Sequence, residues 1–129
     1  MQVIKKNTLS TVVINGEVGA YVFDGSDHGV STSAFIVDVP ADLGPRRHKH
    51  PYEEIFIIVE GSVRIEADGE TVDAGTDDIC VVPADTPHAF SNLGPGRARM
   101  VNIHAAPKVV TEFVAGGPEN IDYHYNHSS

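Results

Sequence analysis

The sequence predicts an all-β protein with little or no helix. Apolar and polar residues alternate with the two-residue period of strands through most of the chain, and no segment carries the 3.6-residue stripe of an amphipathic helix. The apolar segments are short, rich in β-branched and aromatic residues, and separated by clusters of Gly, Pro, Asn and Asp. So many short strands at regular spacing are typical of a sandwich or a barrel.

Two hairpins can be placed from their turn residues. Asn15-Gly16 and Asp68-Gly69 can adopt the positive φ angles that tight two-residue turns require. In chain order, the expected strands cover residues 11–14, 18–23, 32–39, 54–60, 62–67, 71–73, 79–82, 88–91, 97–105 and, as a last short piece, 109–114.

The length of 129 residues is that of one ordinary domain. We expect residues 1–115 to form the barrel with its N-terminal strands, and the polar residues 116–129 to form a C-terminal tail. Nine Lys and Arg against eighteen Asp and Glu give a formal net charge of -9, which repels phosphate backbones. Nucleic acid is therefore not an expected partner.

The sequence also bears on the cellular compartment. Cys80 is the only cysteine, so no intrachain disulfide can form, which fits a reducing cytoplasm. The apolar run at residues 12–14 is too short for the core of a signal peptide. No stretch approaches the roughly 18 consecutive apolar residues of a membrane helix. We expect a cytoplasmic protein that does not bind membranes.

The strand at residues 54–60 is apolar on both faces. Phe56 and Ile58 lie on one face, and Ile55, Ile57 and Val59 lie on the other. A small barrel covers only its inner face, so the outer apolar row needs a second layer from another subunit. This pattern predicts a homodimer.

One cluster of residues points to a metal ion. His48 and His50 are two residues apart, so an extended backbone places both imidazoles on one face. Glu54 has the same parity, and the bend forced by Pro51 can bring its carboxylate beside them. His88 can supply a fourth ligand from a later strand.

These residues also fit the first motif of a known family, the cupins, which are small β-barrels. That motif runs Gly, five residues, His-x-His, three or four residues, Glu, six residues, Gly. Here His48, His50, Glu54 and Gly61 match it, whereas Asp42 stands in the place of the opening glycine.

The second cupin motif runs Gly, five residues, Pro-x-Gly, two residues, His, three residues, Asn. Pro83, His88 and Asn92 match it, Asp85 stands in the place of its inner glycine, and Gly75 lies two residues too early for the first. Aspartate is among the few residues that tolerate a left-handed turn conformation, so these departures leave the fold assignment in place. The sequence resembles a single-domain cupin, a jelly-roll or double-stranded β-helix barrel.

The resemblance implies one divalent transition metal ion held by His48, His50, Glu54 and His88 near one mouth of the barrel. Four protein ligands leave about two positions of an octahedral ion free for water, substrate or dioxygen. Imidazole and carboxylate suit Fe, Mn, Ni, Co, Cu and Zn alike, so the ligand set does not name the ion. The alternative is that the histidines are buried hydrogen-bonding residues without a metal.

A substrate pocket is expected beside the ion. By alternation, Phe56, Ile58 and Phe90 point into the barrel, where they either line the pocket or are simply barrel core, and Met100 shares its face of the late strand with Asn102 and His104. His104 is then either an acid or base beside the ligands or an ordinary histidine.

Tyr52, next to the ligands, either donates a hydrogen bond to the substrate or lies at the rim of the barrel.

The leading functional hypothesis is a metal-dependent, dioxygenase-like oxidoreductase for a small organic molecule, with Glu54 able to act as a base. A metal-dependent isomerase or lyase acting on a sugar or carbonyl compound would use the same ion to polarise a carbonyl group. A cupin that binds a small molecule without catalysis is the third possibility.

Overall fold

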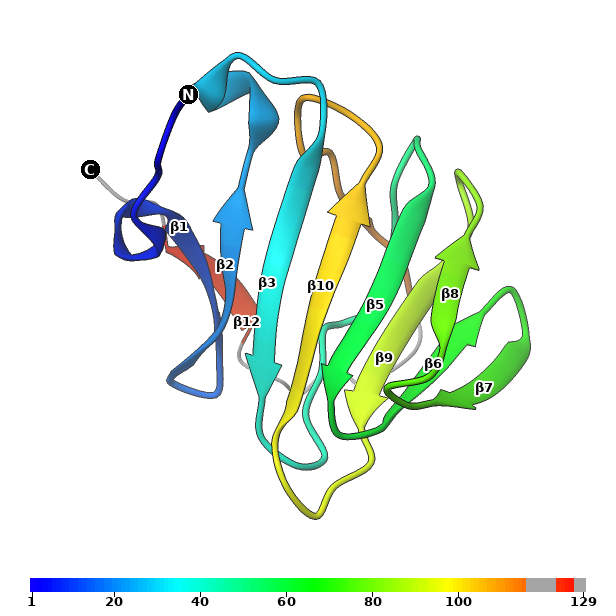
Figure 1. Ribbon diagram of the computed structural model, residues 1–129. Helices are drawn as coiled ribbons and strands as arrows, with labels where there is room; N and C mark the ends of the chain where they lie inside the picture. Colours follow the sequence, from blue (N-terminus) through cyan, green and yellow to red (C-terminus); the bar gives the residue numbers. More distant parts are fainter. Residues whose placement is uncertain (116–122, 127–129) are drawn as a thin grey trace.

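The computed structural model describes residues 1–115 and 123–126, and it is built from two antiparallel β-sheets. Figure 1 shows β3, β10 and β5 in the middle of the larger sheet, with β6, β7 and β9 gathered at its β8 end. The larger sheet has the order β12 (Tyr123–Asn126), β1 (Ser10–Ile14), β2 (Glu17–Phe23), β3 (Ser33–Val39), β10 (Ala98–His104), β5 (Glu54–Glu60) and β8 (Ile79–Val82). The smaller sheet has the order β11 (Glu112–Phe113), β4 (His48–Lys49), β9 (His88–Asn92), β6 (Val63–Ala67) and β7 (Glu70–Ala74).

The all-β prediction is confirmed. Within the described residues, helix is limited to two short 3-10 turns, Lys6–Thr8 and Gly25–His28. None of the helical turns there is long and apolar enough to cross a bilayer. The short strand β4 was not expected, and the expected piece at 109–114 is reduced to β11. Strands of two residues are too short for a period-two pattern to reveal.

Part of the segment that the sequence assigns to a C-terminal tail forms a strand. Within 116–129, the four residues of β12 pair antiparallel with β1, so that Thr11 lies opposite Asn126 and Ile14 lies opposite Tyr123. The other residues of this segment lie outside the described part of the chain. The division into a barrel at 1–115 and a tail at 116–129 otherwise stays a prediction.

The two aspartates in the glycine places of the family motifs adopt the left-handed conformation. Their φ angles are 68° at Asp42 and 60° at Asp85, so the backbone keeps the turn that glycine would make. The predicted hairpin turns have the same property, with φ of 49° at Asn15 and 48° at Asp68. The turn at Asp85 also reaches the metal-site loop, because its N–H donates to the carbonyl of His50 at 2.7 Å.

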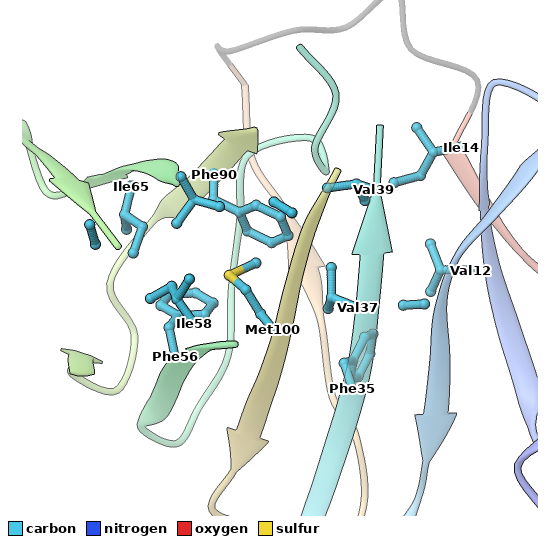
Figure 2. Packing of buried hydrophobic residues seen from close by; sticks show 14 of the residues in the cluster. Val12, Ile14, Phe35, Val37, Val39, Phe56, Ile58, Ile65, Phe90 and Met100 are labelled. Atoms are coloured by element: carbon cyan, nitrogen blue, oxygen red, sulfur yellow. The ribbon is translucent and has the colours of Figure 1, made fainter. Parts of the chain in front are cut away.

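The core lies between the two sheets. Phe56 and Met100 are almost fully buried there, at 0% and 1% exposure, and Ile58 is buried beside them. Figure 2 shows these side chains facing Phe90 and Ile65, which come from the smaller sheet. Burying each large apolar side chain stabilises the fold by about 1.5–3 kcal/mol relative to exposure. Inward-facing Phe56 and Ile58 agree with the predicted alternation.

The strand register arranges the inward side chains of the larger sheet in rows. Ser33, His104 and Glu54 form one row across β3, β10 and β5. The next row consists of Phe35, Asn102 and Phe56. Since successive residues on one face of a strand are two positions apart, the second row lies one step deeper in the barrel.

Candidate metal centre

Four side chains converge at one end of the barrel. His48 belongs to β4, His50 follows it in a loop, Glu54 opens β5 and His88 opens β9. The antiparallel pairing of β4 with β9 places His48 directly opposite His88. One nitrogen or oxygen from each of the four residues lies within 4.8 Å of the others, and all four residues are buried.

Main-chain carbonyls fix the tautomers of the three histidines. Each ring has its Nδ1 within hydrogen-bond distance of a carbonyl oxygen, which can only accept a hydrogen bond, so each Nδ1 carries the proton and donates it. Each Nε2 is then left with a lone pair, which is the arrangement that metal-binding histidines share. The accepting carbonyls belong to Arg46 for His48 (2.6 Å), Val110 for His50 (2.8 Å) and Thr86 for His88 (2.8 Å).

The position of Glu54 makes the set suitable for a cation. Its Oε1 lies 3.1 Å from Nε2 of His50 and 3.0 Å from Nε2 of His88. A carboxylate oxygen and a neutral imidazole nitrogen both present lone pairs, so these contacts require a proton or a cation between the atoms. The buried Nε2 of His50 also makes no hydrogen bond of good geometry with any described residue. The donor set therefore fits a divalent transition metal ion.

The carboxyl group of Glu54 is held in its charged form. Burial by itself would raise the pKa of Glu54, but the neighbouring imidazoles, His104 foremost, outweigh this effect and hold the pKa well below its ordinary value. The site therefore presents an anionic ligand at neutral pH.

The imidazole of His48 is held in its neutral form. Burial, together with the neighbouring His88, lowers the pKa of His48 to about 3, and the hydrogen bond to the carbonyl of Arg46 offsets only part of this shift. A metal ion can bind only the deprotonated nitrogen, so this environment prepares His48 as a ligand.

His104 extends the centre beyond the four predicted ligands. It is buried, and its Nε2 lies 3.3 Å from Oε2 of Glu54, while its Nδ1 lies 2.6 Å from the hydroxyl of Tyr52. That hydroxyl accepts the N–H of Val110 at 3.3 Å and can donate its own proton to Nδ1 of His104. Nε2 of His104 then carries a proton and donates it to Glu54, which holds the carboxylate in place.

A narrow cavity with a volume of about 30 Å³ opens beside the centre. His48, His50, Glu54 and His104 line it together with Asn102. Its other walls are mainly apolar and come from β1, β2, β3 and β9, including Val12, Ile14, Phe35, Val37, Val39 and Phe90.

The predicted pocket residues divide into two groups. Phe90 lines the cavity, but Phe56 and Met100 lie behind its wall in the core. Tyr52 is neither at the rim nor part of the cavity wall, because it is 8% exposed and its hydroxyl contacts His104. The inward alternation was predicted correctly for Phe56 and Phe90, but alternation does not distinguish a cavity wall from filled core.

The N-terminal strands supply walls that the sequence reasoning left out. Phe35 and Val37 lie on alternate positions of β3, so the period-two pattern of that strand could have indicated them. The main-chain carbonyls that orient the histidines leave no such signal, because every residue type carries one.

Comparison with known proteins agrees with this architecture. The model of the family described as Cupin domain matches residues 34–104, more than half of the chain, and this stretch contains all four residues of the candidate metal centre. The chain is a cupin. Its all-β structure with two antiparallel sheets is the fold expected from the two motifs.

Two curated relatives resemble this cupin over part of its length. Polyketide synthase CurC of Streptomyces cyaneus is 43% identical over 61 residues, which make up 46% of this chain and 39% of that protein. The uncharacterized HTH-type transcriptional regulator YobQ of Bacillus subtilis is 26% identical over 69 residues, 54% of this chain and 29% of that protein. The chain thus spans well under half the length of either relative.

Among solved structures, a variant of the Bacillus subtilis oxalate decarboxylase OxdC resembles this cupin in fold. The TM-score is 0.67 at 19% identity, and the match covers 74% of this chain and 27% of that one. At this level of identity the likeness concerns the fold alone.

Proposed function

We propose that this cupin is a metal-dependent enzyme, of the dioxygenase-like oxidoreductase type, for a small and largely apolar organic molecule. The observation that supports this most strongly is the convergence of three imidazole lone pairs and one carboxylate beside a cavity with mainly apolar walls. Four protein ligands leave about two positions of an octahedral ion free, as a catalytic site requires. The substrate would approach these positions from the cavity.

Each residue of the centre has a part in this proposal. His48, His50, Glu54 and His88 would hold one ion of Fe, Mn, Ni, Co, Cu or Zn. Such an ion, when bound, supplies redox chemistry with dioxygen or polarises a carbonyl group. Glu54 can accept a proton from the substrate, and His104 holds the second oxygen of its carboxylate meanwhile. The apolar walls keep bulk water away from the reacting atoms.

The relative named Polyketide synthase CurC favours a polyketide as the class of substrate. Polyketides carry carbonyl groups, whose oxygens can occupy the free positions of the ion. The same relative supports a second candidate function, an isomerase or lyase in which polarisation of a carbonyl eases the removal of a neighbouring proton.

The relative named as an HTH-type transcriptional regulator supports a third candidate, a cupin that binds a small molecule without turnover. We propose the cytoplasm as the compartment for all three functions, because the chain contains a single cysteine, Cys80.

Elemental analysis of the purified protein tests the metal centre. We expect about one transition metal ion per chain in the unaltered protein, and its loss in His88→Ala. His28→Ala is the matched control, since His28 stacks on Phe23 away from the centre. Absence of metal from the unaltered protein, or full retention in His88→Ala, would contradict the proposal.

Oxygen dependence separates the candidate functions. The metal-loaded protein is mixed with short 1,3-diketones, which serve as small analogues of a polyketide, in air and under anaerobic conditions. Consumption of dioxygen in step with the diketone supports the oxidoreductase. Turnover that continues without oxygen supports the isomerase or lyase, and binding without turnover supports the non-catalytic cupin.

A further inference from the structure

The amide of Asn102 stands out among the residues that line the cavity. The side chain is 3% exposed, and its Oδ1 is buried without a hydrogen bond to any residue that the structure describes. A buried amide oxygen without a partner costs free energy, so native proteins rarely keep one. Here the unpartnered oxygen belongs to a residue of the cavity wall.

The two neighbours of Asn102 in the strand register are apolar. In the register of the larger sheet it lies between Phe35 on β3 and Phe56 on β5, and Figure 2 shows these two rings on either side of β10. A residue of this kind in an apolar wall determines which ligand binds, because an apolar ligand leaves the amide unpaired.

The register also fixes where Asn102 lies relative to the metal centre. His104 and Glu54 form the row at the mouth, and Asn102 belongs to the next row inward on the same face. Two residues along a strand correspond to about 7 Å. That spacing separates the backbones of His104 and Asn102, so a ligand that reaches both the ion and Asn102 must carry a second polar group several atoms away from the oxygen on the ion.

We propose that Asn102 is the residue that determines substrate specificity, and that it selects molecules with a hydroxyl group at the end remote from the oxygen that binds the metal. This inference rests on the proposed function and narrows its substrate class to hydroxyl-bearing compounds. A hydroxyl donates to Oδ1, and it can equally accept from the amide NH₂ if the amide is turned over. A ketone can only accept, so it can pair with the NH₂ of a turned amide but not with Oδ1, whereas a hydroxyl can pair with either.

Two matched probes test this assignment. Benzohydroxamate can bind a metal ion through its hydroxamate oxygens, and 4-hydroxybenzohydroxamate adds a hydroxyl at the far end of the ring. The dissociation constants of both are measured from the visible spectrum of the Co²⁺-loaded protein. We expect the hydroxylated probe to bind about tenfold more tightly, the effect of one buried hydrogen bond.

The variant Asn102→Leu removes the amide at similar volume, and we expect it to abolish this tenfold preference. The control is Ile58→Val, a small core change outside the cavity wall, which should retain the preference. Circular dichroism verifies that both variants are folded, and their cobalt content verifies that the metal site is occupied. The comparison of the two probes on the unaltered protein does not depend on either variant.

The outcomes distinguish this inference from the proposed function. If both probes perturb the Co²⁺ spectrum with equal affinity, the assignment of Asn102 is overturned while the metal centre stands. If the preference persists in Asn102→Leu, the hydroxyl is recognised elsewhere and the assignment is likewise overturned. If neither probe perturbs the spectrum, the open metal site is wrong, and the inference falls with it.

Discussion

Tyr52 and His104 act on the centre through Glu54. Among the described hydrogen bonds, Nδ1 of His104 has one partner that can donate a proton to it, and this partner is the hydroxyl of Tyr52. In Tyr52→Phe this hydroxyl is absent, so the proton of His104 is no longer held on Nε2. The hydrogen bond from Nε2 that orients the carboxylate of Glu54 is then weaker. Because such supporting contacts are typically worth 10–100-fold in metal affinity, we expect roughly a tenfold loss. Competition with a chromophoric chelator for Co²⁺ measures it.

Tyr21→Phe is the control for this experiment, since Tyr21 lies on β2 and contacts Lys6 rather than the centre. Equal Co²⁺ affinity in Tyr52→Phe and the unaltered protein would mean that the hydrogen-bonded chain does not orient Glu54.

The pKa values of His48 and Glu54 make the metal-free protein sensitive to acid. The pKa of His48 falls to about 3 in the folded state, so between about pH 6.5 and 3 the unfolded chain binds the extra proton. Stability is therefore complete above pH 6.5 and decreases as the pH falls. The loss from this group between pH 6.5 and 5 is on the order of 2 kcal/mol. The depressed pKa of Glu54 adds a further loss below about pH 4.5, with the same sign.

Urea unfolding of the chelator-treated protein between pH 8 and 5 measures this dependence. In His48→Gln the ionisable ring is absent, so the slope between pH 6.5 and 5 should become shallower. A slope that is the same in both proteins would contradict the assignment to His48.

The cluster of His48, His50, Glu54 and His88 could be predicted from the sequence because residue types and their spacing along the chain are visible there. His48, His50 and Glu54 share parity along one segment, and His88 follows a proline that stiffens the turn before it. The role of His104 could not be decided in the same way. It depends on the partner of each ring nitrogen, and those partners come from Glu54 and Tyr52 through strand pairing that the sequence does not display.

Among the elements, the loop before β4 ties the segment that carries His48 to β9 of the smaller sheet. The N–H of Asp42 donates to the carbonyl of Asn92, and the N–H of Asn92 donates to the carbonyl of Leu43. Gly44 follows in this loop and passes so close to β9 that an added Cβ would stand 1.7 Å from the carbonyl oxygen of Phe90. Only glycine allows this approach.

We therefore expect Gly44→Ala to destabilise the protein by about 2 kcal/mol or more, because backbone must move to relieve the overlap. The displaced loop should also weaken metal binding at His48. Gly96→Ala is the control, since a Cβ there meets nothing within 4 Å. Thermal unfolding of both variants checks the difference, and similar midpoints would show that the loop accommodates a side chain at no cost.

The length of a strand decides whether the sequence reveals it. Strands of five to seven residues, such as β3 and β5, are long enough to show a run of β-branched and aromatic residues between turn residues, and they were predicted. The two-residue β4 exists only because its neighbours β9 and β11 hold it, so its tertiary contacts rather than its own pattern define it. The strand β12 was assigned to a tail for a similar reason, because the polar composition of its segment hides a pairing with β1.

At the scale of the whole molecule, the outer face of the larger sheet stays apolar. Two rows of outward side chains cross β8, β5 and β10 in register, and this outer apolar face consists of Val81, Ile55, Ile103, Ile79, Ile57 and Val101. Its members on the edge strand β8 are strongly exposed, with Ile79 at 68% and Val81 at 62%. Contiguous apolar rows of this kind are rare on the surface of a monomer.

We expect a second copy of the chain to cover this face, because a flat two-row patch is self-complementary about a two-fold axis. Sedimentation velocity at micromolar concentration should then give twice the mass of the chain. Val81→Lys places a charge in the patch and should shift the protein toward monomer, whereas Val72→Lys, at a similarly exposed valine on β7 of the other sheet, should not. A monomeric unaltered protein, or a dimer indifferent to Val81→Lys, would remove this face as the interface. Because Glu54 opens the same strand that carries Ile55 and Ile57, dimerisation would also brace the strand that supplies the anionic ligand.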